Sequence, residues 1–380
     1  MSEGEICARH YATAKPVRLR WKAGKIIQLE PGPERLEIDQ WIAPPLMDLQ
    51  INGYGGVDFQ RDGLTLEDLL SATRQLRRDG CGQYLLTLIT DEWSALMKRL
   101  GQLKRLRDES PELRHAILGW HVEGPFLSAQ PGFCGAHNPA VMEDPHPRHI
   151  RELRAVIGND PVLLTLAPER AGALEAIERA VSVGIIVSLG HTNATAEVLA
   201  AAVRAGATGF THFGNALPQQ LDRHDNLLWR VLDTPGLTVS LIPDTFHVSP
   251  MFFRLAHRAL PPERIYYTTD AMAAAGASPG RYTIGRIELE VGADQIVRMP
   301  GKPNFAGSAL RPIDGVFRAA AMLGCSWQQT WDYFAKQPAS LLKRVNELAV
   351  GAPADFCLLR FSDEQQLSGL SVYVEGEIID

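Results

Sequence analysis

Short apolar runs alternate with amphipathic stretches through most of the chain. Runs that are apolar at nearly every position are typical of parallel strands buried on both faces. Eight such runs occur, namely Leu46–Ile51, Tyr84–Ile89, Ala116–Val122, Val162–Leu166, Ile185–Leu189, Thr208–Thr211, Leu237–Ile242 and Ile265–Thr268. Most gaps between them hold a recognisable helix, for example Thr65–Arg78, Glu92–Asp108, Ala173–Val183 and Thr195–Ala205. Eight parallel strands with crossover helices predict an α/β fold, a (β/α)₈ barrel of the TIM type.

The two ends of the chain follow a different pattern, in which apolar and polar residues alternate as in half-buried antiparallel strands. Three segments alternate in this way: Val17–Leu29, Phe356–Leu359 and Val372–Ile379. We therefore expect both termini to build one small β-sandwich domain from residues 1–43 and 345–380. The catalytic barrel would then occupy residues 44–344. A further β-rich stretch, Tyr282–Met299, follows the eighth strand and is interpreted as an excursion from the barrel.

The composition narrows the class of protein. The chain has 380 residues, 45% hydrophobic and 22% charged, with a net charge of −6, which is typical of a globular enzyme and argues against a nucleic-acid partner. No apolar run approaches the roughly 20 residues of a membrane span, and no signal peptide is recognisable. The five cysteines are scattered and include no CxxC pair, which is typical of reduced thiols. These features predict a cytoplasmic enzyme without a membrane partner.

Polar and ionisable residues stand at or just past the end of nearly every predicted strand. They are Gln50, Asn52, His121, Glu123, His191, His212, Asp244, His247 and Asp270. Taken singly, each has a structural interpretation as a hydrogen-bonded strand end, a turn or a helix cap. In barrels of this type, however, catalytic groups come from the carboxyl ends of the strands. Four such ends with ionisable residues on one rim indicate an active site.

Three of these residues match a metal site. Glu123, His191 and His212 form the set of three ligands that is typical of a catalytic divalent ion, with one coordination position left for water. Such an ion lowers the pKa of that water towards neutrality. Asp270, at a fourth strand end, is placed to hold the water and to move protons. His121 lies two residues before Glu123 on the same side of the strand, and we expect it to support the site from behind.

A resemblance to a known family follows from eight motifs. They are Asp48-Leu-Gln-Ile-Asn-Gly, His121-Val-Glu-Gly-Pro-Phe-Leu, Gly135-Ala-His-Asn-Pro, Thr165-Leu-Ala-Pro-Glu, Ser188-Leu-Gly-His-Thr-Asn-Ala, Thr211-His-Phe-Gly-Asn-Ala, Thr269-Asp-Ala-Met and Ala306-Gly-Ser-Ala-Leu. In this order the set resembles the N-acetylglucosamine-6-phosphate deacetylases of the amidohydrolase superfamily. The resemblance implies metal-dependent hydrolysis of the acetamide of N-acetylglucosamine 6-phosphate, which gives glucosamine 6-phosphate and acetate.

The resemblance also implies roles for single residues around the metal. Glu123, His191 and His212 correspond to the ligands. Asp270 corresponds to the base that activates the water and then protonates the leaving amine, and His247 to the group that polarises the acetamide carbonyl. Amide hydrolysis needs a strong nucleophile, a polarised carbonyl and a protonated leaving nitrogen, and these residues with the ion would supply all three.

Substrate contacts are implied in the same way. The positions are Ala136, His137, Asn215, Ala216, His247, Phe305, Ala306 and Gly307. Arg223 is similar to the family's phosphate-binding arginine, which reaches into the neighbouring subunit's site, so the resemblance implies a homodimer. Gln50 and Asn52 stand where many amidohydrolases have a His-x-His pair for a second metal. Because amides bind metals poorly, we expect one divalent ion, Zn²⁺ first and Fe²⁺, Co²⁺ or Mn²⁺ as alternatives.

The chain departs from the family pattern around the sugar pocket. Arg223 has Asp222 beside it, Pro243-Asp-Thr-Phe-His replaces the usual Ala-Asp-Gly-x-His, and Arg311 follows the Ser308 segment. The alternatives are therefore deacetylation of N-acetylgalactosamine 6-phosphate or of an unphosphorylated sugar. A cyclic-amide hydrolase with two metals would need a lysine after the fourth strand, where Glu169 stands, and a non-catalytic scaffold would have lost a ligand. Cys134, without a partner base, is interpreted as inert.

Overall fold

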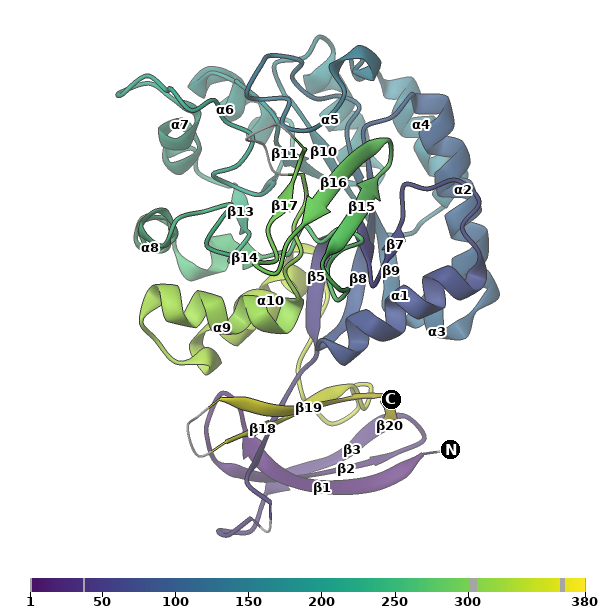
Figure 1. Ribbon diagram of the computed structural model, residues 1–380, viewed down its shortest axis with the longest axis vertical. Helices are drawn as coiled ribbons and strands as arrows, with labels where there is room; N and C mark the ends of the chain where they lie inside the picture. Colours follow the sequence, from purple (N-terminus) through teal and green to yellow (C-terminus); the bar gives the residue numbers. More distant parts are fainter. Residues whose placement is uncertain (1, 37, 301–305, 363–365, 380) are drawn as a thin grey trace.

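Eight parallel strands form the centre of the larger part of the molecule, in a computed structural model that describes residues 2–36, 38–300, 306–362 and 366–379 (Figure 1). The strands are β5 (Leu46–Ile51), β8 (Cys81–Ile89), β9 (Ile117–Glu123), β10 (Val162–Leu166), β11 (Ile186–Leu189), β12 (Gly209–Phe210), β13 (Thr238–Leu241) and β14 (Ile265–Tyr267). They pair in the order β14-β13-β12-β11-β10-β9-β8-β5. The prediction of eight parallel strands is confirmed, with differences of a few residues at the strand ends.

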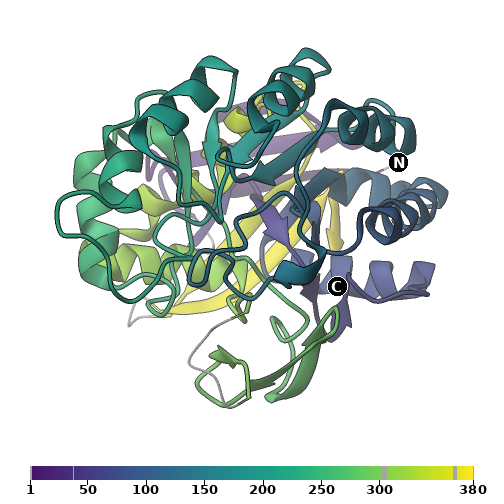
Figure 2. The ribbon, with the colours of Figure 1, turned by 90° about the horizontal axis from the view of Figure 1, so that it is seen from above.

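Helices surround these strands, as Figure 2 shows from above. They are α1 (Leu66–Arg78), α2 (Trp93–Glu109), α3 (Pro111–Ala116), α4 (Pro147–Ile157), α5 (Ala173–Ser182), α6 (Ala196–Arg204), α7 (Leu227–Asp233), α8 (Pro250–Ala259), α9 (Pro312–Leu323), α10 (Trp327–Leu341) and the 3₁₀ turns η1 (Pro139–Val141) and η2 (Pro262–Arg264). The start of α1 is fixed by a capping box, in which Thr65 and Asp68 each accept a backbone N–H of the other. The four helices expected from the sequence are confirmed.

The barrel has a seam between its first and last strands. Neighbouring strands from β8 to β14 are joined by parallel ladders, and β5 joins β8 in the same way. Within the described chain, β5 and β14 share no ladder, and they occupy the two ends of the sheet order. The gap is crossed by an isolated bridge between Ile51, the last residue of β5, and Ala271, four residues after β14, and Ala271 in turn bridges to Ser308.

Both ends of the chain contribute to a second sheet below the barrel (Figure 1). It contains β1 (Glu3–His10), β2 (Pro16–Lys22), β3 (Lys25–Pro31), β4 (Gln40–Ala43), β18 (Phe356–Phe361), β19 (Leu367–Val374) and β20 (Glu377–Ile379), in the order β20-β19-β18-β4-β1-β2-β3. Strands β18 and β19 lie above β1–β3, with Leu19, Trp21 and Phe356 in the core between them. The expectation that the termini share one β unit is confirmed. Strands β1 and β4 were not predicted, because β1 buries little more than Ala8 and β4 has four residues.

Four polar residues, which we call the interface cluster, connect the barrel to this sheet. Arg77 at the end of α1 is 2% exposed and lies 3.3 Å from Glu112 Oε1 and 3.3 Å from His115 Nδ1. His115 Nε2 is 3.0 Å from a carboxylate oxygen of Asp355, which precedes β18. Each charge in this cluster therefore has an opposite charge or a hydrogen-bond partner beside it.

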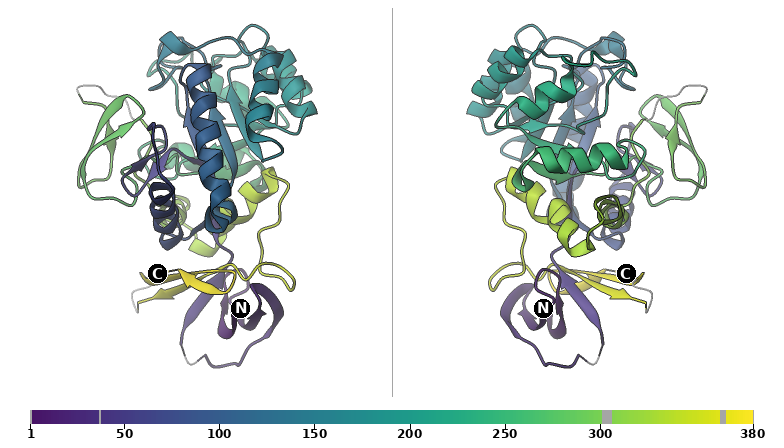
Figure 3. Two further views of the ribbon diagram at one scale, coloured as in Figure 1. Left: turned by 90° about the vertical axis from the view of Figure 1, so that its right-hand side faces the viewer. Right: turned by 90° about the vertical axis from the view of Figure 1, so that its left-hand side faces the viewer.

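Two smaller sheets lie next to the barrel. One is the pair β6 (Gly53–Tyr54) and β7 (Val57–Asp58), and the other is the antiparallel sheet β15 (Gly280–Ile284), β16 (Ile287–Val291) and β17 (Val297–Arg298), which projects from one side (Figure 3). The predicted excursion after the eighth strand is thus confirmed. Asp58 holds its tip, accepting hydrogen bonds from Gly285 N (2.8 Å) and Thr283 Oγ1 (3.1 Å). No helix in the described ranges has the length and apolar character needed to cross a membrane.

Candidate active site

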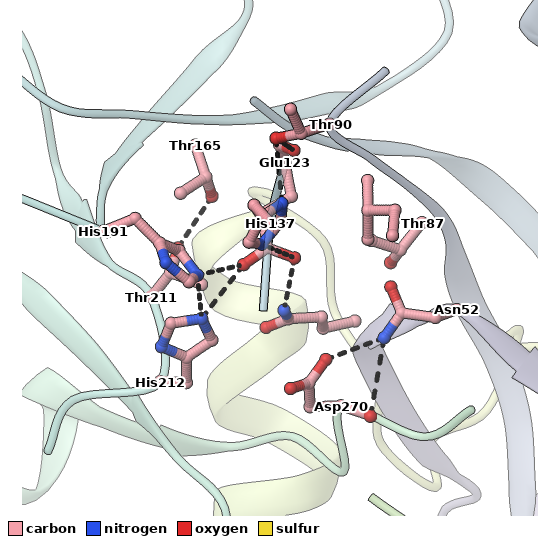
Figure 4. Close-up of polar contacts among 12 residues, drawn as sticks. Asn52, Thr87, Thr90, Glu123, His137, Thr165, His191, Thr211, His212 and Asp270 are labelled. Carbon is pink, nitrogen blue, oxygen red and sulfur yellow. Dashed lines mark hydrogen bonds and ion pairs between the residues drawn. The ribbon is translucent and has the colours of Figure 1, made fainter. Parts of the chain in front are cut away.

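Glu123, His191 and His212 converge past the carboxyl ends of β9, β11 and β12 (Figure 4). Glu123 Oε1 lies 2.9 Å from His212 Nε2 and 3.2 Å from His191 Nε2, and the two Nε2 atoms are 3.1 Å apart. All three side chains are buried, and one potential ligand atom from each lies within 4.8 Å of the others. The three predicted ligands are therefore brought together at one point.

The donor set fits a divalent cation. Two imidazole nitrogens face each other and the same carboxylate oxygen, an arrangement that one cation would satisfy together. His191 Nδ1 lies 3.0 Å from the carbonyl oxygen of Phe133, and a ring that donates there keeps its Nε2 lone pair for a metal. Gln50 Nε2 donates to Glu123 Oε2 at 3.1 Å, which leaves Oε1 directed at the histidines. Gln50 thus orients the Glu123 carboxylate and is not itself part of the group that could hold an ion.

The backbone at this rim is strained. His191, His212 and Asp270 adopt φ values of 49°, 35° and 53°, in the left-handed region that side chains with a Cβ atom avoid. Each such residue costs on the order of 1–3 kcal/mol and persists only where the surrounding structure imposes it, most often at functional sites. We call Glu123, His191, His212 and Asp270 the rim cluster.

Asp270 lines the same pocket as Glu123, His191 and His212 and is held by Asn52. The Asn52 amide donates to Asp270 Oδ1 at 2.7 Å, so the second residue of the predicted vestigial pair also orients a carboxylate. Burial, together with the charge of Glu123, raises the pKa of Asp270 to about 7, while His212 and His247 act in the opposite direction. A bound cation would also act to lower the pKa of Asp270. A carboxylate at this position can accept a proton and return it.

His247 is oriented from behind by Asp244. Its Nδ1 lies 2.5 Å from Asp244 Oδ2, and Asp244 Oδ1 accepts the backbone N–H groups of Phe246 and His247. Burial lowers the pKa of His247, but the charge and hydrogen bond of Asp244 outweigh this and raise it overall. Thr245, inside the turn, has a φ of 73°, which is unusual for a β-branched residue. His247 therefore presents an imidazole whose orientation and charge are controlled by a buried carboxylate.

A pocket of about 450 Å³ opens over these residues, a size that suits a small sugar derivative. It is lined by the predicted contacts Ala136, His137, Asn215, Ala216, His247, Ala306 and Gly307 and by Glu123, His191, His212, Asn52 and Asp270. Phe305 lies outside the described residues. One wall is apolar and includes Ile89, Ile284 and Ile287, which were not predicted because two of them belong to the excursion.

Three predicted residues lie away from the pocket lining, namely Gln50 (which contacts Glu123), His121 and Arg223. His121 is fully buried, with Nδ1 3.0 Å from the Leu49 carbonyl oxygen and Nε2 2.8 Å from Thr165 Oγ1, and burial lowers its pKa to about 4. It acts as a neutral hydrogen-bonded group inside the barrel. Arg223 is exposed in the loop before α7. Among the described residues that line the pocket there is neither lysine nor arginine.

Comparisons with known proteins agree with this geometry. The chain is 32% identical to the N-acetylglucosamine-6-phosphate deacetylase of Rattus norvegicus over 353 residues, which cover 89% of this chain and 83% of the relative. It is 28% identical to the enzyme of that name from Bacillus subtilis over 327 residues (84% and 81%). It is also 31% identical to the N-acetylgalactosamine-6-phosphate deacetylase of Shewanella sp. over 337 residues (88% and 82%). No protein-family model matches the chain.

Solved structures give the same result over the whole chain. A point mutant of the N-acetyl-D-glucosamine-6-phosphate deacetylase from Mycobacterium smegmatis, in complex with N-acetyl-D-glucosamine 6-phosphate, superposes with a TM-score of 0.88 at 28% identity and covers 100% of both chains. The N-acetylglucosamine-6-phosphate deacetylase from Pasteurella multocida gives a TM-score of 0.84 at 27% identity and covers 99% of both chains.

Proposed function

The chain belongs to the N-acetylglucosamine-6-phosphate deacetylase family, within the amidohydrolase superfamily, and we propose that it hydrolyses the acetamide of N-acetylglucosamine 6-phosphate to glucosamine 6-phosphate and acetate. The observation that carries this proposal is the convergence of Glu123, His191 and His212 beside Asp270. The pocket above them has the size of a small sugar derivative. The identity of the sugar is proposed from the names of the similar proteins.

Each residue of the site has a separate task in the proposed reaction. Glu123, His191 and His212 would hold a divalent cation, and the chemistry that such an ion would supply is activation of water and polarisation of the acyl oxygen. Asp270 accepts a proton from the water and transfers it to the leaving nitrogen, while Asn52 occupies its Oδ1 atom. His247, oriented by Asp244, donates a hydrogen bond to the acyl oxygen as negative charge develops there.

We propose one metal ion per chain, with Zn²⁺ as the first candidate. Gln50 and Asn52 support this proposal. Their amide nitrogens already donate to Glu123 and Asp270. Amides are also poor ligands for a second ion. Protein reconstituted with excess metal should therefore bind about one equivalent. A stable plateau at two equivalents would contradict the proposal.

We also propose a homodimer in which Arg223 binds the phosphate of the sugar held by the other subunit. Exposed large apolar side chains lie in α7, α8 and the loops before them: Leu221, Trp229, Phe246, Met251 and Leu255. The carboxylates on either side of Arg223 are occupied, since Asp225 pairs with Arg230 at 2.6 Å and Asp222 accepts two backbone N–H groups. Arg223 is therefore available for an external anion, and arginine donates two hydrogen bonds to phosphate in a fixed geometry.

The alternative is an N-acetylgalactosamine 6-phosphate substrate, which is favoured by the 31% identity to the Shewanella relative of that name. The two sugars differ in the orientation of one hydroxyl group. An unphosphorylated sugar stays a further alternative. For all of them, we propose a cytoplasmic location, because the five cysteines are free in the structure.

Acetate release from four sugars tests the proposal: N-acetylglucosamine and N-acetylgalactosamine, each with and without the 6-phosphate. We expect the highest kcat/KM for N-acetylglucosamine 6-phosphate. Arg223→Ala should lower kcat/KM at least tenfold for phosphorylated sugars only, because a charge-assisted hydrogen bond is worth about 1.5–3 kcal/mol. Exposed Arg151 on α4 offers the matched control Arg151→Ala. A wild-type preference for the plain sugars would overturn the phosphate assignment.

A further inference from the structure

Asp48 is a fully buried carboxylate in the middle of β5, the first barrel strand. Its two oxygens accept four hydrogen bonds. Oδ1 receives Thr268 Oγ1 at 2.5 Å and the backbone N of Gln50 at 3.0 Å, and Oδ2 receives the backbone N and Oγ1 of Thr269 at 2.9 and 2.6 Å. Three of the four donors thus belong to the two residues that precede Asp270.

These contacts cross the seam of the barrel. No ladder joins β5 to β14 in the described parts of the chain, so the carboxylate of Asp48 makes the connection that a ladder makes elsewhere. Beyond it, Asn52 N donates to the Ala271 carbonyl oxygen at 2.7 Å. The position of the segment around Asp270 therefore depends on the side-chain hydrogen bonds of Asp48 together with the backbone hydrogen bonds from Asn52 N to Ala271 O and from Ser308 N to Asp270 O.

Thr269 transmits the contact to the turn at Asp270. Its hydroxyl donates to Asp48 and accepts the backbone N–H of Ala271 at 3.2 Å. The two hydrogen bonds bracket Asp270, whose φ of 53° lies in the left-handed region. Because a hydroxyl group has one proton, its donation to Asp48 leaves its lone pairs directed at Ala271. Asp48 thus fixes the rotamer on which the strained turn depends.

The two metal-ligand histidines have comparable supports from neighbouring strands. Ser240, on β13, accepts the backbone N–H of His212 at 2.7 Å. Glu169, past β10, accepts the backbone N–H of Asn193 at 2.8 Å, two residues after His191. Those strand pairs also have ladders. At the seam, where no ladder is present among the described residues, the side chain of Asp48 shares this task with the isolated backbone bridge between Ile51 and Ala271.

From these contacts we infer that Asp48 is a positioning residue for Asp270, which it holds in its reactive orientation through Thr269. This inference rests on the proposed function, because it assumes that Asp270 transfers protons. Misplacement of a catalytic group by about 1 Å can cost about a hundredfold in rate. A residue that served only to close the barrel would affect unfolding and leave the turnover of the folded enzyme unchanged.

The test is Asp48→Asn, measured as kcat, KM, bound metal and Tm. The amide has nearly the same shape but cannot accept at both ends, so either Gln50 N or Thr269 N loses its acceptor. We expect kcat on N-acetylglucosamine 6-phosphate to fall between about tenfold and a hundredfold. KM should stay within about threefold of the wild-type value, and bound metal near one equivalent, because substrate contacts and ligands are intact.

A matched control separates positioning from stability. Asp160 stands before β10, at the amino ends of the strands, and accepts hydrogen bonds from Arg107 (2.5 Å) and Trp120 Nε1 (3.0 Å). Asp160→Asn should lower Tm without changing kcat. If Asp48→Asn behaves like this control, or if its loss appears in KM or in bound metal, the inference is overturned.

Two variants of Thr269 test the same inference and remain informative if Asp48→Asn does not fold. Thr269→Val removes the hydroxyl group and should lower kcat about tenfold, whereas Thr269→Ser retains it and should stay within about twofold of wild type. The double variant Asp48→Asn, Thr269→Val should lose no more than the larger single loss, because both changes break one link. Equal kcat for the valine and serine variants, or multiplied losses, would overturn the inference. Failure of the proposed function itself is distinguishable, because the wild-type enzyme would then release no acetate.

Discussion

Two polar clusters, one partly buried and one buried, occupy opposite ends of the barrel strands and are built from similar residue types. In the interface cluster, the Arg77 guanidinium lies against the Glu112 carboxylate, and the His115 imidazole lies 3.0 Å from a carboxylate oxygen of Asp355. In the rim cluster, two carboxylates and two histidines converge without a lysine or arginine among the described pocket residues. The first cluster is complete as folded. The second has an excess of acidic groups that a bound cation would balance.

The two clusters also differ in backbone conformation. His191, His212 and Asp270 at the rim have positive φ values, and Arg77, Glu112, His115 and Asp355 do not. Strain of this kind costs stability and is retained where side chains must meet in one place. The difference teaches that burial of charge alone does not identify an active site. Uncompensated charge together with a strained backbone identifies an active site better than burial of charge alone.

The largest expected effect concerns proton transfer at the rim. Asp270→Asn should lower kcat by about 10⁴-fold, at the upper end for a general acid–base group, because one residue serves two steps. Bound metal and Tm should stay close to wild type, since the amide is nearly isosteric and is not a ligand. Steady-state kinetics with metal analysis checks this. A variant that kept more than about a tenth of wild-type kcat would place the base elsewhere.

The next effect concerns the charge that the rim cluster offers to a cation. Glu123→Gln removes the anionic member of the proposed ligand set. Mutation of a residue that only orients a metal ligand typically lowers metal affinity by about 10–100-fold. Loss of a direct anionic ligand should therefore weaken metal binding by more than about 100-fold. Competition with a chelator of known affinity measures the change. Unaltered affinity would mean that the metal is held by other residues.

The interface cluster should respond in stability and not in turnover. Glu112→Gln leaves the buried guanidinium of Arg77 without its anionic partner. Breaking a fully buried pair costs about 3–5 kcal/mol, and because the Glu112 side chain is 27% exposed we expect about 2–3 kcal/mol in the free energy of unfolding. Urea unfolding gives this value, and kcat at saturating substrate should be unchanged. A tenfold fall in kcat would show that the two clusters are coupled.

The smallest effect relaxes the strain at the rim. Thr245 has a φ of 73° at a position where its family usually has glycine. The variant Thr245→Gly removes a backbone strain of about 1–3 kcal/mol. Glycine also makes the unfolded chain more flexible, which lowers the stability of the folded state by about 0.5–1 kcal/mol. We expect a gain of about 1 kcal/mol in the free energy of unfolding. Thr245→Ala is the control, because alanine keeps its Cβ atom and should not stabilise the turn. Equal stability of the two variants would show that Thr245 is unstrained.

The order of strands and the residues that meet at the rim were predictable because they follow from local patterns. Buried parallel strands are apolar runs, and their carboxyl ends lie on one rim, so Glu123, His191, His212 and Asp270 could be grouped without coordinates. The seam was not predictable. Asp48 was visible as a charge inside an apolar run, but its partners Thr268 and Thr269 lie more than 200 positions away, and no periodicity connects them.

The roles of the two amides were predicted only in part. Gln50 and Asn52 were expected as vestiges of a metal pair, and the structure adds that they donate to Glu123 and Asp270. The apolar wall from Ile284 and Ile287 escaped prediction because a hairpin that leaves the barrel returns over the pocket. Arg223 makes its proposed contact in another subunit, so its role stays a prediction.

The sheet built from both chain ends has a consequence for synthesis. Strand β18 pairs with β4 through Cys357 and Ala43, so the partner of β4 leaves the ribosome roughly 300 residues later. At about 5–20 residues per second, this delay is on the order of 15–60 s. During that interval β4 has an open edge on the side that β18 later covers, and open strand edges are where chains aggregate. Until its second half has emerged, a nascent chain of this protein therefore exposes an unpaired strand edge to other chains, and faster synthesis shortens that exposure.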